Sequence, residues 1–338
     1  MNKKRLLYCL IFSMCFLNSE RLVEAQRISE SDFENRNKLR TDTTPKTHST
    51  SKFIRMVNDA SGNPESLQTS ITRYQGKDGL LVDLIGVIHI GERDYYRKLD
   101  KQFEQYESML YELVAPENNR VPTRQAARKS NNPIHWMQSS MQRMLGLESQ
   151  LQHIDYTKSN FVHADLSPRQ MQQKMAERGD TVWSVGMRAF NEMMQKQSEL
   201  GSSGQAGFGQ DVESFEDLFG LLSNPAKLKR MLATQFASGG ALEAGLGGSL
   251  NKILVEDRNQ AAMEVLHREI GKGRTKLALF YGAAHMPDFE QRLVKELGLK
   301  KTRQAWVEAW DLQSAPSQES PMSGMADIFF LLIDSMDL

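Results

Sequence analysis

A unit of strand, GxxH motif, helix and strand occurs twice in this chain, and this repeat constrains the fold more than any other feature. The motif reads Gly-Val-Ile-His at residues 86–89 and Gly-Ala-Ala-His at residues 282–285. In both units a glutamate, Glu112 or Glu308, stands in the next apolar strand, 26 positions after the glycine (86 to 112 and 282 to 308). The shared order and spacing indicate a duplication or a common structural demand.

The residues around each motif have the patterns of buried strands and amphipathic helices. Residues 80–89 and 109–114 are apolar runs, and between them apolar side chains recur every three or four positions, as in a helix with one apolar stripe. Residues 276–281 and 305–310 flank a second such stripe. A strand–helix–strand connection within one sheet is parallel and right-handed. The repeat therefore predicts an α/β fold with a mostly parallel, pseudo-symmetric sheet flanked by helices.

The α/β domain is expected to span residues 53–312. At its start, residues 67–75 read as a strand, and the Gly-Lys-Asp-Gly sequence at 76–79 reads as a hairpin turn into the strand at 80–89.

A helical insertion is expected within this domain, at about residues 130–248. Residues 133–150 and 168–200 are rich in Met and Gln and predict helices, with a short strand at 161–165 between them. Residues 201–248 hold ten of the 23 glycines, which predicts helices with flexible joints, as in a lid over the sheet.

The N-terminal segment has the features of a secretory signal peptide. A basic start at residues 3–5 leads into the apolar residues 6–17, and Ala25 ends a stretch with small residues at the spacing that a signal peptidase reads. Cleavage near Ala25 would make the protein exported, periplasmic or secreted; a retained hydrophobic anchor is the alternative. Both cysteines, Cys9 and Cys15, lie in this segment, so the mature chain would have no disulfide, thiolate metal site or cysteine nucleophile.

The remaining terminal segments and the charge balance exclude some partners. Residues 26–52 are polar and predict a disordered linker, and residues 313–338 predict a tail whose apolar patch at 328–333 docks on the domain or on a partner. Lys and Arg number 42, as do Asp and Glu, which argues against nucleic acid as a partner. No apolar run reaches about 18 residues, so no transmembrane span is expected. The oligomeric state is left open.

His89 and His285 are the strongest candidates for chemistry. Each follows the carboxyl end of a predicted parallel strand, the edge where open α/β sheets collect their ligand sites. Glu112 lies in an otherwise apolar strand, where an ionised carboxylate needs a cation, a metal or several donors. Two imidazoles and a carboxylate suit a site for Zn, Mn, Fe or Co with an open position for water. The alternatives are imidazoles that cap strand or helix ends and a structural ion pair of Glu112.

Arg258 is the candidate partner of that carboxylate. It falls on the apolar face of a predicted helix, between Leu254 and Ala262, and a guanidinium directed there should meet a carboxylate or a substrate anion. It could also lie along the surface with its charge in water. Asn259 is adjacent and could orient a neighbour.

Five further residues are weaker candidates. Glu92 and Asp288 begin the helices after His89 and His285, where helix capping and a catalytic role are both open. His163 and Asp165 end the predicted strand at 161–165 and could reach the same crevice, or be satisfied core groups. Glu308 is the counterpart of Glu112 in the second unit.

With these residues in view, the sequence resembles the TraB/PrgY family, which includes the Tiki metalloproteases and GumN-type bacterial proteins. The resemblance covers roughly residues 79–312. The family's two GxxH motifs, its acidic residue and its arginine–asparagine pair match residues 86–89, residues 282–285, Glu112 and Arg258-Asn259. The resemblance implies a pseudo-symmetric sheet fold shared with erythromycin esterase and a haem-binding lipoprotein. It also implies either metal-dependent peptidase activity, as in Tiki members, or restraint of a peptide pheromone, as in PrgY-type members.

These observations together predict an exported metal-dependent hydrolase that acts on a peptide or a small ester. His89, His285 and Glu112 would hold the divalent ion (Mn, Co or Zn), Glu92 could take a proton, and Arg258 could stabilise the oxyanion or hold a substrate carboxylate. A metal-free variant would use His89 as the base. The alternative is a non-catalytic protein of the same fold that binds a peptide, a metal or haem, with the Met-rich helices as an adaptable apolar wall.

Overall fold

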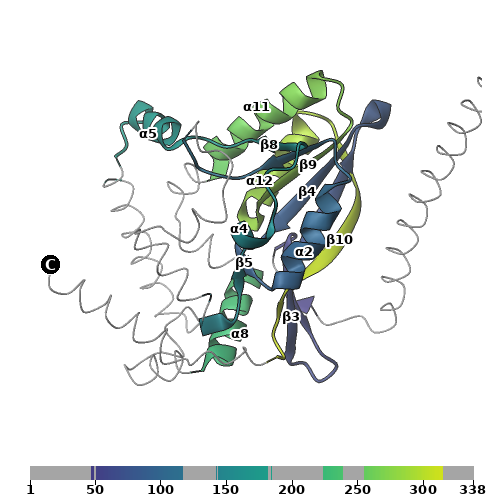
Figure 1. Ribbon diagram of the computed structural model, residues 1–338, viewed down its shortest axis with the longest axis vertical. Coiled ribbons are helices and arrows are strands. Elements are labelled where there is room, and N and C mark those ends of the chain that lie inside the picture. Colours follow the sequence, from purple (N-terminus) through teal and green to yellow (C-terminus); the bar gives the residue numbers. More distant parts are fainter. Residues whose placement is uncertain are drawn as a thin grey trace, which may run out of the picture. The chain divides into compact units, whose positions relative to one another are not determined.

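Four parallel strands form the centre of the sheet in the computed structural model of the protein (Figure 1). The structure describes residues 47–48, 51–116, 142, 144–181, 184, 224–238 and 255–314. The parallel strands lie in the order β4 (Leu81–Val87), β9 (Lys276–Gly282), β6 (Ser108–Tyr111) and β8 (Phe161–His163). The strand of the second unit therefore lies between the two strands of the first. β4, β9 and β6 are apolar along most of their length because both faces of this part of the sheet are covered.

An antiparallel part extends the sheet beyond β4 and completes its eight strands among the described residues. β3 (Pro64–Gln75) pairs with β4 through the predicted hairpin, whose turn contains Asp78 and Gly79 at φ 60° and 80°. Three more antiparallel strands belong to this part: β2 (Ile54–Asn58), β1 (Thr47–His48) and β10 (Lys300–Asp311). Since β1 pairs with β2, ordered structure begins a few residues before the predicted start at Phe53.

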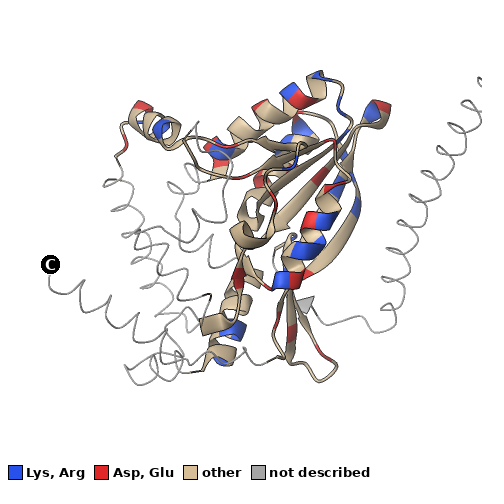
Figure 2. Ribbon diagram, in the orientation of Figure 1, with Lys and Arg blue, Asp and Glu red and all other residues tan. Residues whose placement is uncertain are grey.

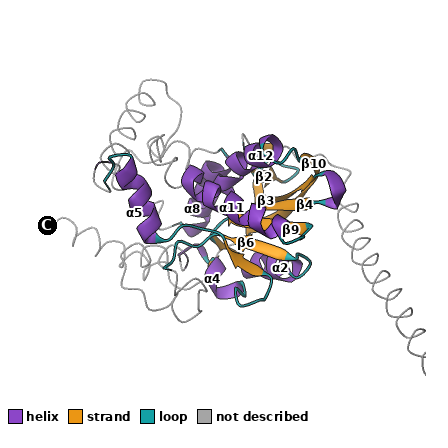
Figure 3. Cartoon of the chain, turned by 90° about the horizontal axis from the view of Figure 1, so that it is seen from above, coloured by secondary structure: helices purple, strands orange, loops and turns teal. Residues whose placement is uncertain are grey.

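Helices cover the two faces of the sheet, so that in Figure 3 the strands lie between α2 and α12. On one face, α2 (Arg93–Phe103) and α8 (Pro225–Ala237) pack into a core cluster with Ile85, Phe280 and Trp310. On the other, α11 (Asp257–Gly271) and α12 (Met286–Lys295) pack into a second cluster. α2 buries Tyr95, Tyr96, Leu99 and Phe103. Acidic and basic residues are interspersed along the same helix (Figure 2). The predicted α/β fold, mostly parallel at its centre and flanked by helices, is confirmed.

The two repeated units differ in how their last strands pair. In the first unit, α2 leads from β4 to β6, which joins the parallel strand β9. In the second, α12 leads from β9 to β10, which pairs along its whole length with β3 in antiparallel fashion. β10 is thereby part of the antiparallel extension and not of the parallel centre.

The described part of the insertion contains both predicted and unpredicted elements. α5 (Pro168–Glu177) begins where a helix is expected, with a Ser167 capping box, and it ends well before residue 200, ahead of Gly179 at φ 71°. β7 (Glu148–Ser149) pairs with β5 (Ile90–Gly91), and α4 (Gln150–His153) follows it, where the end of a helix was expected. The predicted signal peptide, most of the predicted linker, the glycine-rich segment apart from α8 and its flanking residues, and nearly all of the tail lie outside the described residues.

No helix within the described ranges is both long enough and apolar enough to cross a bilayer.

Candidate functional site

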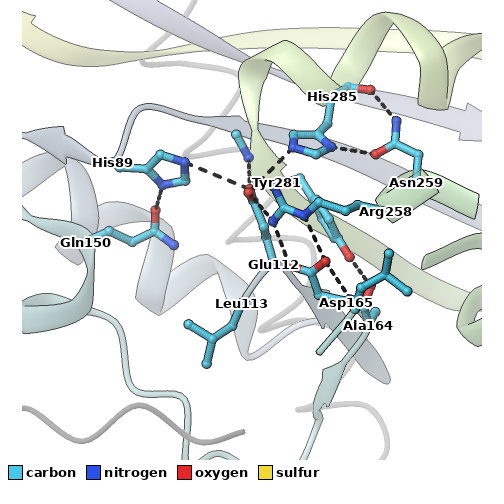
Figure 4. Close-up of polar contacts among 12 residues, drawn as sticks. His89, Glu112, Leu113, Gln150, Ala164, Asp165, Arg258, Asn259, Tyr281 and His285 are labelled. Carbon is cyan, nitrogen blue, oxygen red and sulfur yellow. Dashed lines mark hydrogen bonds and ion pairs between the residues drawn. The ribbon is translucent and has the colours of Figure 1, made fainter. Parts of the chain in front are cut away.

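His89, Glu112 and His285 come together at the carboxyl ends of β4, β6 and β9 (Figure 4). The Glu112 side chain lies between the two rings: its Oε1 is 3.5 Å from Nε2 of His285, and its Oε2 is 4.0 Å from Nε2 of His89. The three side chains meet because β4, β9 and β6 are parallel neighbours. Residues that follow the carboxyl ends of such strands lie at one edge of the sheet. The structure thus brings the two GxxH histidines and the strand glutamate to one place.

The atoms packed around residue 282 explain why the second motif has a glycine at its first position. A Cβ atom on residue 282 would lie 3.2 Å from Nε2 of His89 and 3.3 Å from Oε2 of Glu112. Any side chain there would therefore press on the atoms that face one another in the site. The backbone N–H of Gly282 also donates a hydrogen bond of 2.6 Å to Oε2 of Glu112.

Glu112 is ionised in this environment although its side chain is only 10% exposed. Burial raises the pKa of Glu112, but its attraction to His285, His89 and Arg258 outweighs burial and holds the pKa well below its usual range. Oε1 accepts a hydrogen bond of 2.6 Å from Nη2 of Arg258. Both carboxylate oxygens therefore have a close donor.

Arg258 binds both Glu112 and Asp165, and Asp165 lies two residues after the end of β8. Its Nε and Nη2 donate to the two oxygens of Asp165 at 2.9 and 2.6 Å, and the Asp165 side chain is fully buried. Burial lowers the pKa of Arg258, and the two carboxylates more than reverse this, so the guanidinium stays charged. With two carboxylates and one guanidinium, these three side chains carry a net charge of −1 in a buried setting. Such a charge favours a further cation nearby.

Asn259 fixes the orientation of His285. Nδ1 of His285 lies 2.6 Å from the amide oxygen of Asn259, and the Asn259 amide nitrogen donates to the His285 carbonyl at 3.0 Å and to Asp288 at 2.8 Å. An amide oxygen can only accept, so Nδ1 carries the proton. Nε2 is then the nitrogen that faces Glu112. Asp288, for which helix capping and a catalytic role were both open, holds this amide in place and accepts a hydrogen bond of 2.6 Å from Nε of Arg292.

Gln150 orients the ring of His89 as Asn259 orients that of His285. Its amide oxygen lies 2.9 Å from Nδ1 of His89, and its amide nitrogen donates to the hydroxyl of Tyr156 at 2.6 Å. The His89 side chain is 59% exposed, against 5% for His285. Sequence reasoning missed Gln150, and no motif or periodicity marks it, because a neutral amide near the end of an expected helix has no distinctive pattern.

Three predicted candidates have other partners. Glu92 accepts a hydrogen bond of 2.8 Å from Nζ of Lys229, whose side chain is only 5% exposed, so this carboxylate is engaged in an ion pair. Nε2 of His163 donates to the backbone carbonyl of Leu113 at 2.7 Å, which ties the ring to the loop after β6. Glu308 lies on β10 opposite Gln68 of β3, in the antiparallel part of the sheet, because the last strand of the second unit does not pair as that of the first does.

The donor set suits a divalent ion in its chemistry. Within the described ranges, no three His, Cys, Asp or Glu side chains form a group that could hold a metal as they stand. Ligand atoms about 2.05 Å from a tetrahedral ion lie about 3.4 Å apart. The distance of 3.5 Å between Nε2 of His285 and Oε1 of Glu112 meets this value. The 4.0 Å between Nε2 of His89 and the other carboxylate oxygen, Oε2, exceeds it by about 0.6 Å. His89 is the exposed member of the three, so its ring is the one with room to approach an ion.

Comparison with protein-family models, with curated proteins and with solved structures finds no match for this chain. The function is therefore inferred from the chemistry of the site.

Proposed function

We propose that the protein is an exported metal-dependent hydrolase of the peptidase type, in line with its resemblance to the TraB/PrgY family. His89, His285 and Glu112 would hold a divalent ion, Mn, Co or Zn. One observation carries the proposal: both Nδ1 atoms donate to amide oxygens, so both Nε2 atoms face one ionised carboxylate. The attraction between Glu112 and the two rings requires a positive charge between each Nε2 and the carboxylate, and a divalent ion bound there would supply it to both rings at once. Metal-binding histidines in general have their second nitrogen held in this way.

The bound ion would polarise a peptide or ester carbonyl and lower the pKa of a water molecule. The chain's own residues prepare the site for it. Arg258 and the Gly282 N–H hold Glu112 ionised and fixed in orientation, and the two amides fix the imidazoles. The substrate approaches from the side of His89, since His285 is almost fully buried.

Two expected roles change in this proposal. Arg258 is only 10% exposed and is bound to Asp165 and Glu112, so it acts on the carboxylate and not on a substrate anion. Glu92 is paired with Lys229, so it is not the group that takes a proton.

A metal-free hydrolase is the second candidate, and a specific observation favours it. Both oxygens of Glu112 already accept hydrogen bonds of 2.6 Å, which leaves them less free to bind an ion. In this candidate Nε2 of the exposed His89 ring takes the proton from the attacking water, and the nearby Glu112 carboxylate stabilises the positive charge that the ring gains.

Metal analysis of the purified mature chain separates the two candidates. We expect about one ion per chain after loading with Mn, Co or Zn, and loss of the ion in both His89→Ala and His285→Ala, because each removes one ligand. His267→Ala, at an exposed position of α11, is the matched control and should keep the ion. Circular dichroism checks that all variants are folded. Equal metal content in all four proteins, or none in the parent, would favour the metal-free candidate.

Turnover distinguishes either hydrolase from a binding protein. With a library of peptides and small esters, His89→Ala should abolish hydrolysis while binding of the same compounds persists. A non-catalytic protein would turn over no library member, and a haem-binding one would give a Soret band on titration with haem.

A further inference from the structure

The two imidazoles receive their amide partners from different parts of the fold. Asn259 belongs to α11, which packs on the parallel centre of the sheet. Gln150 belongs to residues 148–156, which lie outside both repeated units. We call these residues the Gln150 segment. His285 is therefore held by a helix that packs on the parallel centre of the sheet, whereas His89 depends on an added piece of chain.

The Gln150 segment is hydrogen-bonded to residues 89–93 at several points. β7 pairs with β5, so that Ile90 lies opposite Ser149 and Gly91 opposite Glu148. The N–H of Gln150 donates to the carbonyl of His89 at 3.1 Å. Glu148 also binds Arg93 at the start of α2, at 2.9 Å. The position of the Gln150 side chain is thus set by a structure built on residues 89–93.

The amide of Gln150 is buried and has a defined orientation. The residue is 4% exposed, and its nitrogen donates to the Tyr156 hydroxyl, which turns its oxygen toward Nδ1 of His89. Glu112 acts in the opposite sense. A carboxylate 4.0 Å from Nε2 attracts the ring proton to that nitrogen, where it would occupy the lone pair. The acceptor on Gln150 is what keeps a proton on the other side of the ring.

We propose that Gln150 is a positioning residue that keeps a proton on Nδ1 of His89 and so directs Nε2 toward the centre of the site. The Gln150 segment, and not the two GxxH units alone, then completes the site. The effect on catalysis rests on the proposed function; the effect on the imidazole does not.

The test reads the ring nitrogens of His89 in the full mature chain labelled with ¹⁵N-histidine, with His89→Ala to assign the signals. In the parent, Nδ1 of His89 should be protonated. Gln150→Met keeps the size of the side chain and removes the acceptor, so the proton should move to Nε2. Gln150→Glu keeps an acceptor, so Nδ1 should stay protonated. Gln152→Met, two positions further in the same short helix, is the matched control and should leave His89 as in the parent.

The signals of His285 serve as an internal reference and should not change in any Gln150 variant. If Gln150→Met leaves Nδ1 of His89 protonated, or Gln150→Glu deprotonates it, the proposal is wrong. Should Gln150→Met not fold, Gln150→Leu replaces it, because it also removes the acceptor; an unchanged Nδ1 proton in Gln150→Leu then overturns the proposal.

Activity and metal content give the second readout. Loss of a partner of this kind costs roughly 10- to 100-fold in metal affinity or turnover. We expect that loss in Gln150→Met, mainly in kcat, with recovery in Gln150→Glu. A proton that moves as expected in a protein with neither metal nor turnover would end the proposed function and leave the role of Gln150 intact.

Discussion

His89 and His285 occupy the same place in two repeated motifs, but the protein holds them differently. His285 is buried, lies against Tyr281 and Phe289, and has an amide partner fixed by a backbone carbonyl and a carboxylate. His89 is mostly exposed and takes its amide from the insertion. The repeated motif thus determines where each histidine leaves the sheet, whereas residues outside the motif determine its burial and its hydrogen-bond partner. His285 is the buried side of the site, and His89 is the exposed side.

The largest expected effect comes from removing Arg258, which binds the Glu112 carboxylate that both histidines face. Arg258→Met removes the guanidinium that binds both buried carboxylates, Glu112 and Asp165, so it should lower the free energy of unfolding by about 3–5 kcal/mol. Urea denaturation measures this. Arg97→Met, in an exposed pair with Asp94, is the control and should cost at most about 1 kcal/mol. Similar losses in the two variants would mean that Arg258 does not stabilise the cluster.

Alanine at each histidine tests the comparison directly. His285→Ala opens a cavity beside Tyr281 and Phe289 and should cost about 2–3 kcal/mol in stability, whereas His89→Ala should stay within about 0.5 kcal/mol. Both variants should lose metal and turnover to the same degree. Thermal or urea unfolding checks the first part. Equal stability losses at the two positions would show that the difference in burial has no energetic consequence.

Alanine at each motif glycine gives a smaller effect. Gly282→Ala places a methyl group 3.2–3.3 Å from His89 and Glu112 and should cost about 1–2 kcal/mol and weaken metal binding. At Gly86 the nearest atoms, on Ala283 and Met286, lie 3.4 Å away, so Gly86→Ala should leave metal binding close to that of the parent. Calorimetric titration with Mn or Zn provides the comparison. A larger loss of affinity at Gly86 would contradict the account of the site.

The smallest effect is confined to acid pH. The pKa of Glu112 in the folded protein lies well below its ordinary value of about 4.3. Its contribution to stability is therefore complete above about pH 4.3 and is lost as the pH falls through the folded pKa. Between pH 6 and 3, the stability difference between the parent and Glu112→Gln should be constant at first and then shrink. A difference that stays constant down to pH 3 would mean that the pKa is not lowered.

Much of the fold and part of the site followed from the sequence because they depend on local patterns. The apolar runs at 80–89 and 276–281 require burial on both faces, and parallel neighbours bring the residues after them to one edge. Arg258 and Asn259 followed from their place on one helix. Glu308 did not match Glu112, since the pairing of β10 with β3 depends on contacts far apart in sequence. Gln150 and Lys229 were out of reach for the same reason: the insertion brings them to the GxxH units only in the folded chain.

Anomalous diffraction from crystals of the mature protein soaked in Mn²⁺ tests the central claim most directly. The account predicts one ion at about 2.0–2.2 Å from Nε2 of His89, Nε2 of His285 and an oxygen of Glu112. An ion bound elsewhere, or a site in which both Nε2 atoms donate hydrogen bonds to Glu112 with no ion between them, would contradict it.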